Sequence, residues 1–90
     1  MKDLPESVAP YRETAVFDEA TIPAGLRRAH TTKAGTWGLI EVLEGRLRLR
    51  FVESGEEHVL EAGERGVVAP GEPHEVSPVG PVKMRVVFCR

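Results

Sequence analysis

Two histidines stand out as side chains that could do chemistry, because each lies among small residues and turn signals. His30 is in "RRAHTTKAGTWG" and His74 is in "APGEPHEV". A neutral imidazole binds transition metals and can also act as a general base near neutral pH. Thr32 lies two residues beyond His30 and would share its face of an extended strand. Glu72 lies two residues before His74.

These residues allow two interpretations. Two imidazoles, one carboxylate and open positions suit divalent iron, and the same set can hold zinc or nickel. In that case His30 and His74 are metal ligands, and Glu72, Thr32 or water completes the shell. In the alternative, both histidines are hydrogen-bonded polar residues that line a cavity. The third histidine, His58, lies in the charged segment "ESGEEHV" and is expected at the surface.

The elements that must position these residues are short strands. Branched and aromatic runs alternate with Gly and Pro turns at intervals of about 8–12 residues, which is typical of a sandwich or small barrel. We expect roughly eight strands and no helix longer than one turn. The expected strands are 14–18, 26–33, 37–45, 46–52, 58–62, 67–70, 74–77 and 82–90, and residues 1–13 are expected to form an N-terminal arm.

Composition limits the function classes. A chain of 90 residues with a net charge of -2 is expected to form one domain without a general attraction to nucleic acid or anionic lipid. No apolar run is long enough to span a membrane, and the N-terminus lacks an apolar signal core, so a cytoplasmic location is expected. Cys89 is the only cysteine, and we expect it to be a packed residue rather than a nucleophile.

The segment "LEAGERGVVAPGEPHEV" resembles the second motif of the cupin superfamily, in which a glycine, a proline, a second glycine and a histidine recur at fixed spacing. Gly63, Gly71 and His74 occupy three of these positions, and Ala69 stands at the proline position with Pro70 beside it. The tight turn would swing the next strand back across the barrel mouth, so that its first inward side chain points into the cavity.

The region "HTTKAGTWGLIEVLEG" matches the first cupin motif only in part. That motif supplies a histidine pair, a glutamate and a closing glycine. Gly45 fits the closing glycine, while Gly38 stands where the glutamate would bind. His30 and Thr32 occupy the place of the histidine pair, a residue or two out of register. The resemblance therefore implies a ligand set reduced to His30 and His74.

A narrower resemblance covers about Tyr11 to Arg90. The "PAGL" turn, the "HTTK" with "GTWG", the "VLEG" strand end and the final "GPV" strand are similar to those of the small cupins called TehB-like or tellurite-resistance-related. That family is formally of unknown function. The resemblance implies an all-β, single-domain cupin, a double-stranded β-helix (jelly-roll) barrel over residues 14–90.

Alternation along the strands indicates which side chains face inward. If Gly38 takes the inward place of the glutamate, Ile40 and Val42 also point inward, while Trp37, Leu39, Glu41 and Leu43 point outward. An outward row with three apolar side chains needs covering, and a homodimer interface would cover it. The arginines of "RLRLR" are expected to form a solvated outer face with glutamate neighbours.

Two function classes follow. The first is a cupin that binds a divalent metal (Zn, Fe or Ni) or a small ligand in its barrel, with a link to tellurite or stress response. The second is a small metal-dependent enzyme of dioxygenase or isomerase type, in which His30 and His74 hold the ion. The absent motif glutamate and the lack of a clear acid–base partner favour the first class.

Overall fold

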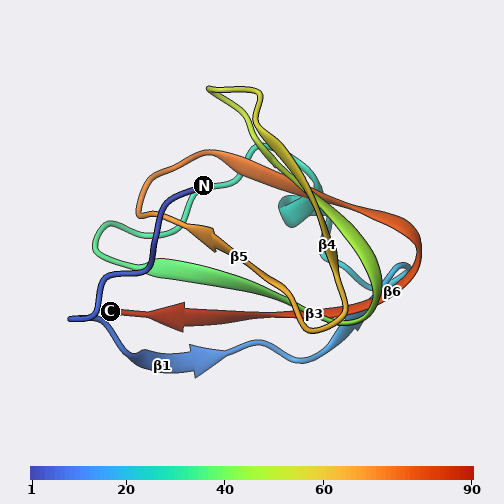
Figure 1. The fold of residues 1–90 in the computed structure, drawn as a ribbon, viewed down its shortest axis with the longest axis horizontal. Coiled ribbons are helices and arrows are strands. Elements are labelled where there is room, and N and C mark those ends of the chain that lie inside the picture. The colour runs from blue at the N-terminus through green and yellow to red at the C-terminus, as the bar shows by residue number, and fades with distance from the viewer.

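The computed structural model describes all 90 residues and contains six strands and one short 3₁₀ helix (Figure 1). Every strand pairing is antiparallel. The all-β prediction is therefore confirmed. The elements are β1 (Pro10–Glu13), β2 (Phe17–Asp18), η1 (Ala24–Arg27), β3 (Trp37–Phe51), β4 (Glu57–Glu61), β5 (Arg65–Val68) and β6 (His74–Cys89).

Two long strands, β3 and β6, run through the whole molecule and pair with each other from Trp37↔Cys89 to Phe51↔His74. Both strands bend midway, so the sheet folds over itself into two layers (Figure 1). The first half of β3 also pairs with β5, and its second half with β4. The strands β1 and β2 extend the sheet on the other side of β6.

The bend in β3 requires a glycine. Gly45 has φ +76°, and a Cβ there would lie 2.0 Å from the carbonyl oxygen of Pro81 on β6. The pairing register of β3 with β6 shifts on both sides of this position, between Val42 and Glu44 and between Gly45 and Leu47. Such irregularities let a sheet turn a corner without ending its strands. The runs 37–45 and 46–52, expected as two strands, are therefore one.

The core lies between the two layers and holds twelve buried apolar residues. Alternation along β3 points Ile40 and Val42 into it, and a fully buried aliphatic side chain of this size stabilises the fold by about 1.5–3 kcal/mol. From β6, Val82 and Met84 reach the same core. The predicted inward face of β3 is confirmed.

The outward face carries a second, smaller apolar cluster of Leu39, Val67, Val87 and Cys89. Leu4 and Val8 of the N-terminal arm pack against it, together with Trp37. The expectation that Trp37 and Leu39 point outward is confirmed. Residues of the same chain cover Trp37 and Leu39, so these two side chains do not indicate a partner subunit.

The N-terminal arm is tied to the sheet along its length. Its last four residues form β1, which pairs with β6, so the predicted boundary after residue 13 falls at the end of a strand. All four residues of β1 are exposed. The arm therefore provides an exposed edge strand in addition to the cover over Leu39.

The run 26–33 is not a strand, contrary to expectation. Residues Ala24–Arg27 form η1, which begins after Pro23 with no side-chain cap. The only strand-like contact of the following loop is an isolated bridge at His30. Gly35, at φ +77°, then turns the chain into β3. No helix in the structure is long and apolar enough to cross a membrane.

Candidate functional site

The two candidate histidines lie side by side. The backbone N–H of His30 donates to the carbonyl of His74 at 2.8 Å, and the N–H of His74 donates back to the carbonyl of His30 at 2.9 Å. Their rings meet edge to face, with centroids 5.4 Å apart and an interplanar angle of 79°. Sequence analysis therefore selected two residues, 44 positions apart, that the fold brings into direct contact.

His74 is the more deeply buried residue of this pair and is only 2% exposed. Its position follows from the turn at Gly71, which has φ +70° and starts the chain back into β6. The Nδ1–H donates to the backbone carbonyl of Glu72 at 2.8 Å, because a carbonyl can only accept. Every fully buried side-chain nitrogen in the structure has a hydrogen-bond partner. The Nε2 of His74 has no such partner, so this atom is partly exposed.

Burial keeps His74 neutral. Desolvation lowers the pKa of His74, and the charge of His30 lowers it further, while the bond to the Glu72 carbonyl opposes both effects. A neutral ring with Nδ1 protonated leaves the lone pair of Nε2 free to accept a hydrogen bond or to bind a metal. His30 is only partly buried and sits at the edge of this arrangement.

Thr32 is buried, and its hydroxyl holds the loop in place. Its Oγ1 donates to the carbonyl of Thr36 at 2.8 Å and lies 3.4 Å from the carbonyl of Ala69. Directly below it, a Cβ on Gly38 would lie 2.7 Å from Val68 and 3.5 Å from the Thr32 methyl group. The position of the cupin glutamate therefore faces inward as expected, but packing leaves no room for that side chain.

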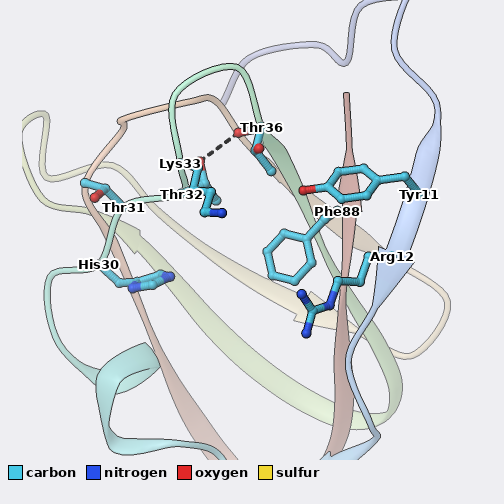
Figure 2. A pocket seen from close by; sticks show the side chains of 8 residues that line it. All are labelled: Tyr11, Arg12, His30, Thr31, Thr32, Lys33, Thr36 and Phe88. Atoms are coloured by element: carbon cyan, nitrogen blue, oxygen red, sulfur yellow. Dashed lines mark hydrogen bonds between the residues drawn. The ribbon is translucent and has the colours of Figure 1, made fainter.

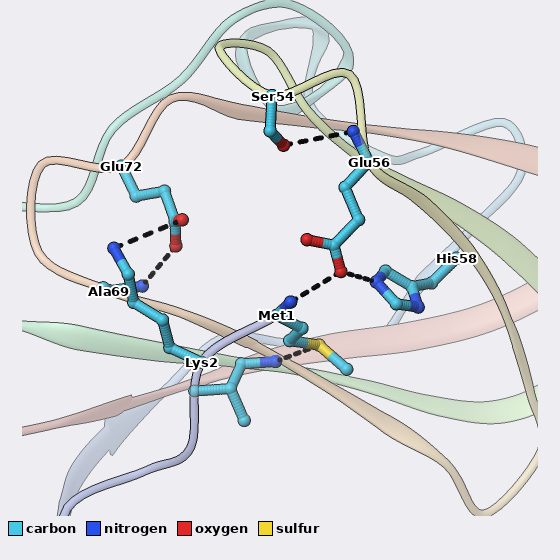
Figure 3. Close-up of polar contacts among 8 residues, drawn as sticks. Met1, Lys2, Ser54, Glu56, His58, Ala69 and Glu72 are labelled. Atoms are coloured by element: carbon cyan, nitrogen blue, oxygen red, sulfur yellow. Dashed lines mark hydrogen bonds and ion pairs between the residues drawn. The ribbon is translucent and has the colours of Figure 1, made fainter.

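Glu72 is turned away from the histidines. Its carboxylate accepts a hydrogen bond from the backbone N–H of Ala69 at 3.1 Å and pairs with the ammonium of Lys2 at 3.5 Å (Figure 3). Those contacts fix the turn before β6 and the N-terminal arm. The structure thus gives Glu72 a structural role and does not bring its carboxylate to the imidazoles.

The donor set implied by the cupin resemblance is therefore assembled only in part. No group of three or more His, Cys, Asp or Glu side chains is placed so that it could hold a metal ion. The centroid separation in the His30–His74 pair, 5.4 Å, is close to the value of about 5 Å expected for two imidazoles that hold one tetrahedral ion at about 2.0–2.1 Å. Glu72 and Thr32 do not fit as further ligands.

A pocket of about 230 Å³ opens beside His30. One wall is the loop of residues 31–36, and the other is formed by Tyr11 and Arg12 of β1 with Phe88 of β6 (Figure 2). In Figure 2 the His30 ring and the Arg12 guanidinium both point into the space between these walls. The pocket therefore lies between the predicted barrel and the predicted arm.

The residues of β1 that line this pocket were not expected from the sequence. Tyr11 and Arg12 fall in the stretch predicted as an arm outside the barrel, and nothing in their local pattern indicates a site. Lys33 follows Thr32 directly and also lines the pocket. Its positive charge beside Thr32 is a signal in the sequence for this wall of the pocket.

The remaining expectations concern residues outside the pocket. His58 is partly exposed and contacts the carboxylate of Glu56, which also binds the amino group of Met1 (Figure 3). Cys89 is completely buried, and desolvation raises the pKa of its thiol, so it is unreactive. Arg50 lies on the outer face of β3 and pairs with Glu75 at 3.1 Å, as expected for a solvated face with glutamate neighbours.

Comparison with known families agrees with this architecture. A family model described as the TehB-like domain matches residues 12–86. The chain belongs to the TehB-like domain family. The match includes both histidines, the loop between η1 and β3, and all strands except part of β1 and the end of β6.

The TehB-like chain is similar to part of a longer protein. The probable S-adenosyl-L-methionine-dependent methyltransferase TehB of Haemophilus influenzae is 34% identical over 53 residues, which are 54% of this chain and 18% of that protein. The crystal structure of TehB from the same organism superimposes with a TM-score of 0.82 at 26% identity, over 93% of this chain and 32% of that one. This chain therefore spans only a minor part of the relative's length.

Other solved structures share the fold. A protein from E. coli strain K12 matches with a TM-score of 0.90 at 20% identity, over 100% of this chain and 97% of that one. A cupin-2 domain protein from Shewanella frigidimarina matches with a TM-score of 0.54 at 20% identity, over 89% of this chain and 64% of that one. The predicted cupin jelly-roll fold is thereby confirmed.

Proposed function

We propose that this TehB-like domain binds a small molecule in the pocket beside His30. The supporting observation is the pocket itself, about 230 Å³, with polar side chains and the Phe88 ring facing one space. Sites for drug-sized ligands typically measure about 300–1,000 Å³. The proposed ligand is therefore a metabolite of modest size.

The walls of the pocket are held in place without a ligand. Thr32 ties its loop through the bond to Thr36, and the N–H of Thr36 donates to the carbonyl of Lys33 at 3.0 Å. On the opposite wall, the Arg90 guanidinium lies 4.0 Å from the centroid of the Tyr11 ring. A preformed site loses little conformational entropy on binding, which favours affinity.

A fragment screen by amide chemical-shift perturbation tests this function, with neutral, cationic and anionic fragments tested separately. We expect at least one fragment to shift Thr36 and Phe88 signals in a saturable way. The exposed rim residue Thr31 offers a blocking variant: Thr31→Trp should abolish these shifts, while Val59→Trp on exposed β4 should not. Absence of any saturable shift at the pocket would overturn the proposal.

A second proposal is a divalent ion (Zn, Fe or Ni) on His30 and His74, with water completing the shell. It is favoured by the ring separation of 5.4 Å and by the bond from Nδ1 of His74 to a carbonyl, the usual partner of a metal-bound imidazole. Metal content and rebinding of the purified protein test it. His74→Ala should lose the ion and His58→Ala should keep it. Equal metal content in both variants would exclude this pair.

The finer functional predictions depend on these sites. Dioxygenase or isomerase activity is the alternative to simple ligand or metal binding. This activity requires the ion on His30 and His74, so it is tested only after metal binding is found.

A link to tellurite or stress response is tested by tellurite sensitivity of cells that lack the protein, complemented with wild type or with Thr31→Trp. If both forms restore tellurite resistance equally, the phenotype does not depend on the pocket.

The homodimer also stays a prediction. Leu43 and Val59 are 41% and 49% exposed on the outer surface, and a partner subunit would cover apolar side chains of this kind. Light scattering of the intact protein gives the mass directly. A monomer at all concentrations would contradict the prediction.

A further inference from the structure

The pocket beside His30 is lined by basic side chains and by no carboxylate. Arg12 and Lys33 reach it from opposite walls (Figure 2), and neither makes an ion pair within the chain. The nearest acidic residue along β1, Glu13, is engaged by Arg85 at 3.4 Å. Two positively charged side chains without acidic partners at one pocket favour a negatively charged ligand.

The chemistry of the two cations suits a carboxylate. The guanidinium of Arg12 offers several N–H groups in a fixed plane, which matches the two oxygens of a carboxylate. Lys33 adds a flexible ammonium from the other side. Tyr11 also lines the space, and its hydroxyl, which points into the space in Figure 2, can donate to an oxygen of the ligand.

The rest of the pocket suits a flat apolar group. Phe88 belongs partly to the core and shows its ring to the pocket, while the Tyr11 ring is held by Arg90 on the neighbouring surface. Aromatic faces of this kind pack against other flat rings. A bare inorganic oxyanion would leave these surfaces unused.

We infer that the ligand of this pocket is a small organic carboxylate, held through its charge by Arg12 and Lys33 and through its apolar body by Phe88. This inference rests on the proposed ligand-binding function and specifies the chemical class of the ligand. An inorganic oxyanion, which shares the charge, and a neutral aromatic compound, which shares the shape, are the alternatives.

Titrations with three probes separate these alternatives: benzoate, its neutral analogue benzamide, and sulfate. We expect benzoate to bind at the pocket at least about tenfold more tightly than either of the other two. Arg12→Gln and Lys33→Gln should each weaken benzoate binding about tenfold. The matched control Arg46→Gln removes one positive charge from the exposed part of β3 and should leave the affinity within about twofold.

The following results would overturn the inference. Equal affinity for benzamide would show that charge is not recognised, and equal affinity for sulfate would show that the apolar body is not. If Arg46→Gln and Arg12→Gln weaken benzoate binding equally, benzoate responds to the overall charge of the protein rather than to a specific contact with Arg12. If neutral or cationic fragments bind at the pocket and benzoate does not, ligand binding stands and the carboxylate assignment fails. If no fragment of any charge binds, the proposed function itself fails.

Discussion

Two groups of basic side chains on this protein behave differently. The arginine face, Arg46, Arg48 and Arg50 on the second half of β3, has glutamates beside it, and Arg50 contacts both Glu57 and Glu75. The pocket holds Arg12 and Lys33 with no carboxylate among its lining residues. Both groups are partly or fully exposed, so the number of charges does not distinguish them. The difference lies in the neighbouring side chains: Arg50 is paired with two glutamates and Arg46 lies opposite Glu61 on β4, whereas no carboxylate lines the pocket that holds Arg12 and Lys33.

Charge reversal should separate the two groups most strongly. Arg12→Glu replaces a donor by a like charge facing the carboxylate, so we expect benzoate affinity to fall about a hundredfold. Arg46→Glu on the arginine face should leave affinity nearly unchanged. Isothermal titration of both variants measures the ratio, and equal effects would remove the distinction between the two groups.

The two histidines should also differ in their contribution to stability. His74 is buried and hydrogen-bonded, so His74→Ala should lower the free energy of unfolding by about 2–3 kcal/mol. His30 is partly buried with no side-chain hydrogen bond, and His30→Ala should cost less than about 1 kcal/mol. Urea denaturation measures both. A larger loss for His30→Ala would show that the partly buried histidine, rather than the buried one, supports the fold.

Stability should fall between pH 7 and pH 5. The pKa of His74 is below its ordinary value of 6.5 in the folded chain, so in this interval the unfolded chain binds more protons. The contribution is complete above about 6.5 and is lost as the pH falls towards the folded pKa. Asp18 and Glu56 also have lowered pKa values, but from ordinary values of 3.8 and 4.5, so they act at lower pH.

Thermal unfolding at the two pH values measures this effect, with His74→Gln as the comparison. The variant keeps a polar side chain but cannot titrate, so its midpoint should change less between pH 7 and pH 5. An unchanged pH dependence in the variant would assign the effect to other groups.

The smallest expected effect belongs to the arginine face. Arg50→Gln removes the ion pairs with Glu57 and Glu75, which are partly exposed, so the loss should be below about 1 kcal/mol. Benzoate affinity should not change. Reduced affinity in this variant would show that the two basic groups are coupled.

The fold could be predicted from the sequence in its main lines. Alternation along 37–52 predicted the inward and outward faces correctly, because a pleated strand places successive side chains on opposite sides. The number of strands was overestimated, because Gly45 was interpreted as a strand end and in fact permits a bend within β3. The run 26–33 has strand-like composition, but η1 and the bridge at His30 replace a strand there.

The candidate site was predictable only where a motif marked it. The spacing Gly63–Gly71–His74 and the partial first motif identified two histidines that are in contact in the fold. Nothing in the sequence indicated that Glu72 would turn towards Lys2, because a carboxylate's partner depends on where the arm lies. Arg12 reaches the pocket through the pairing of β1 with β6, a contact between chain segments that no local pattern records.

A crystal structure of the intact protein grown with benzoate shows whether the pocket holds a carboxylate. We expect the carboxylate within about 2.7–2.9 Å of the Arg12 guanidinium, with the ring against Phe88 and Lys33 on the opposite side. Benzoate bound elsewhere, or a pocket that holds only water at saturating ligand while Arg12 pairs with an acidic side chain of its own chain, would contradict this expectation.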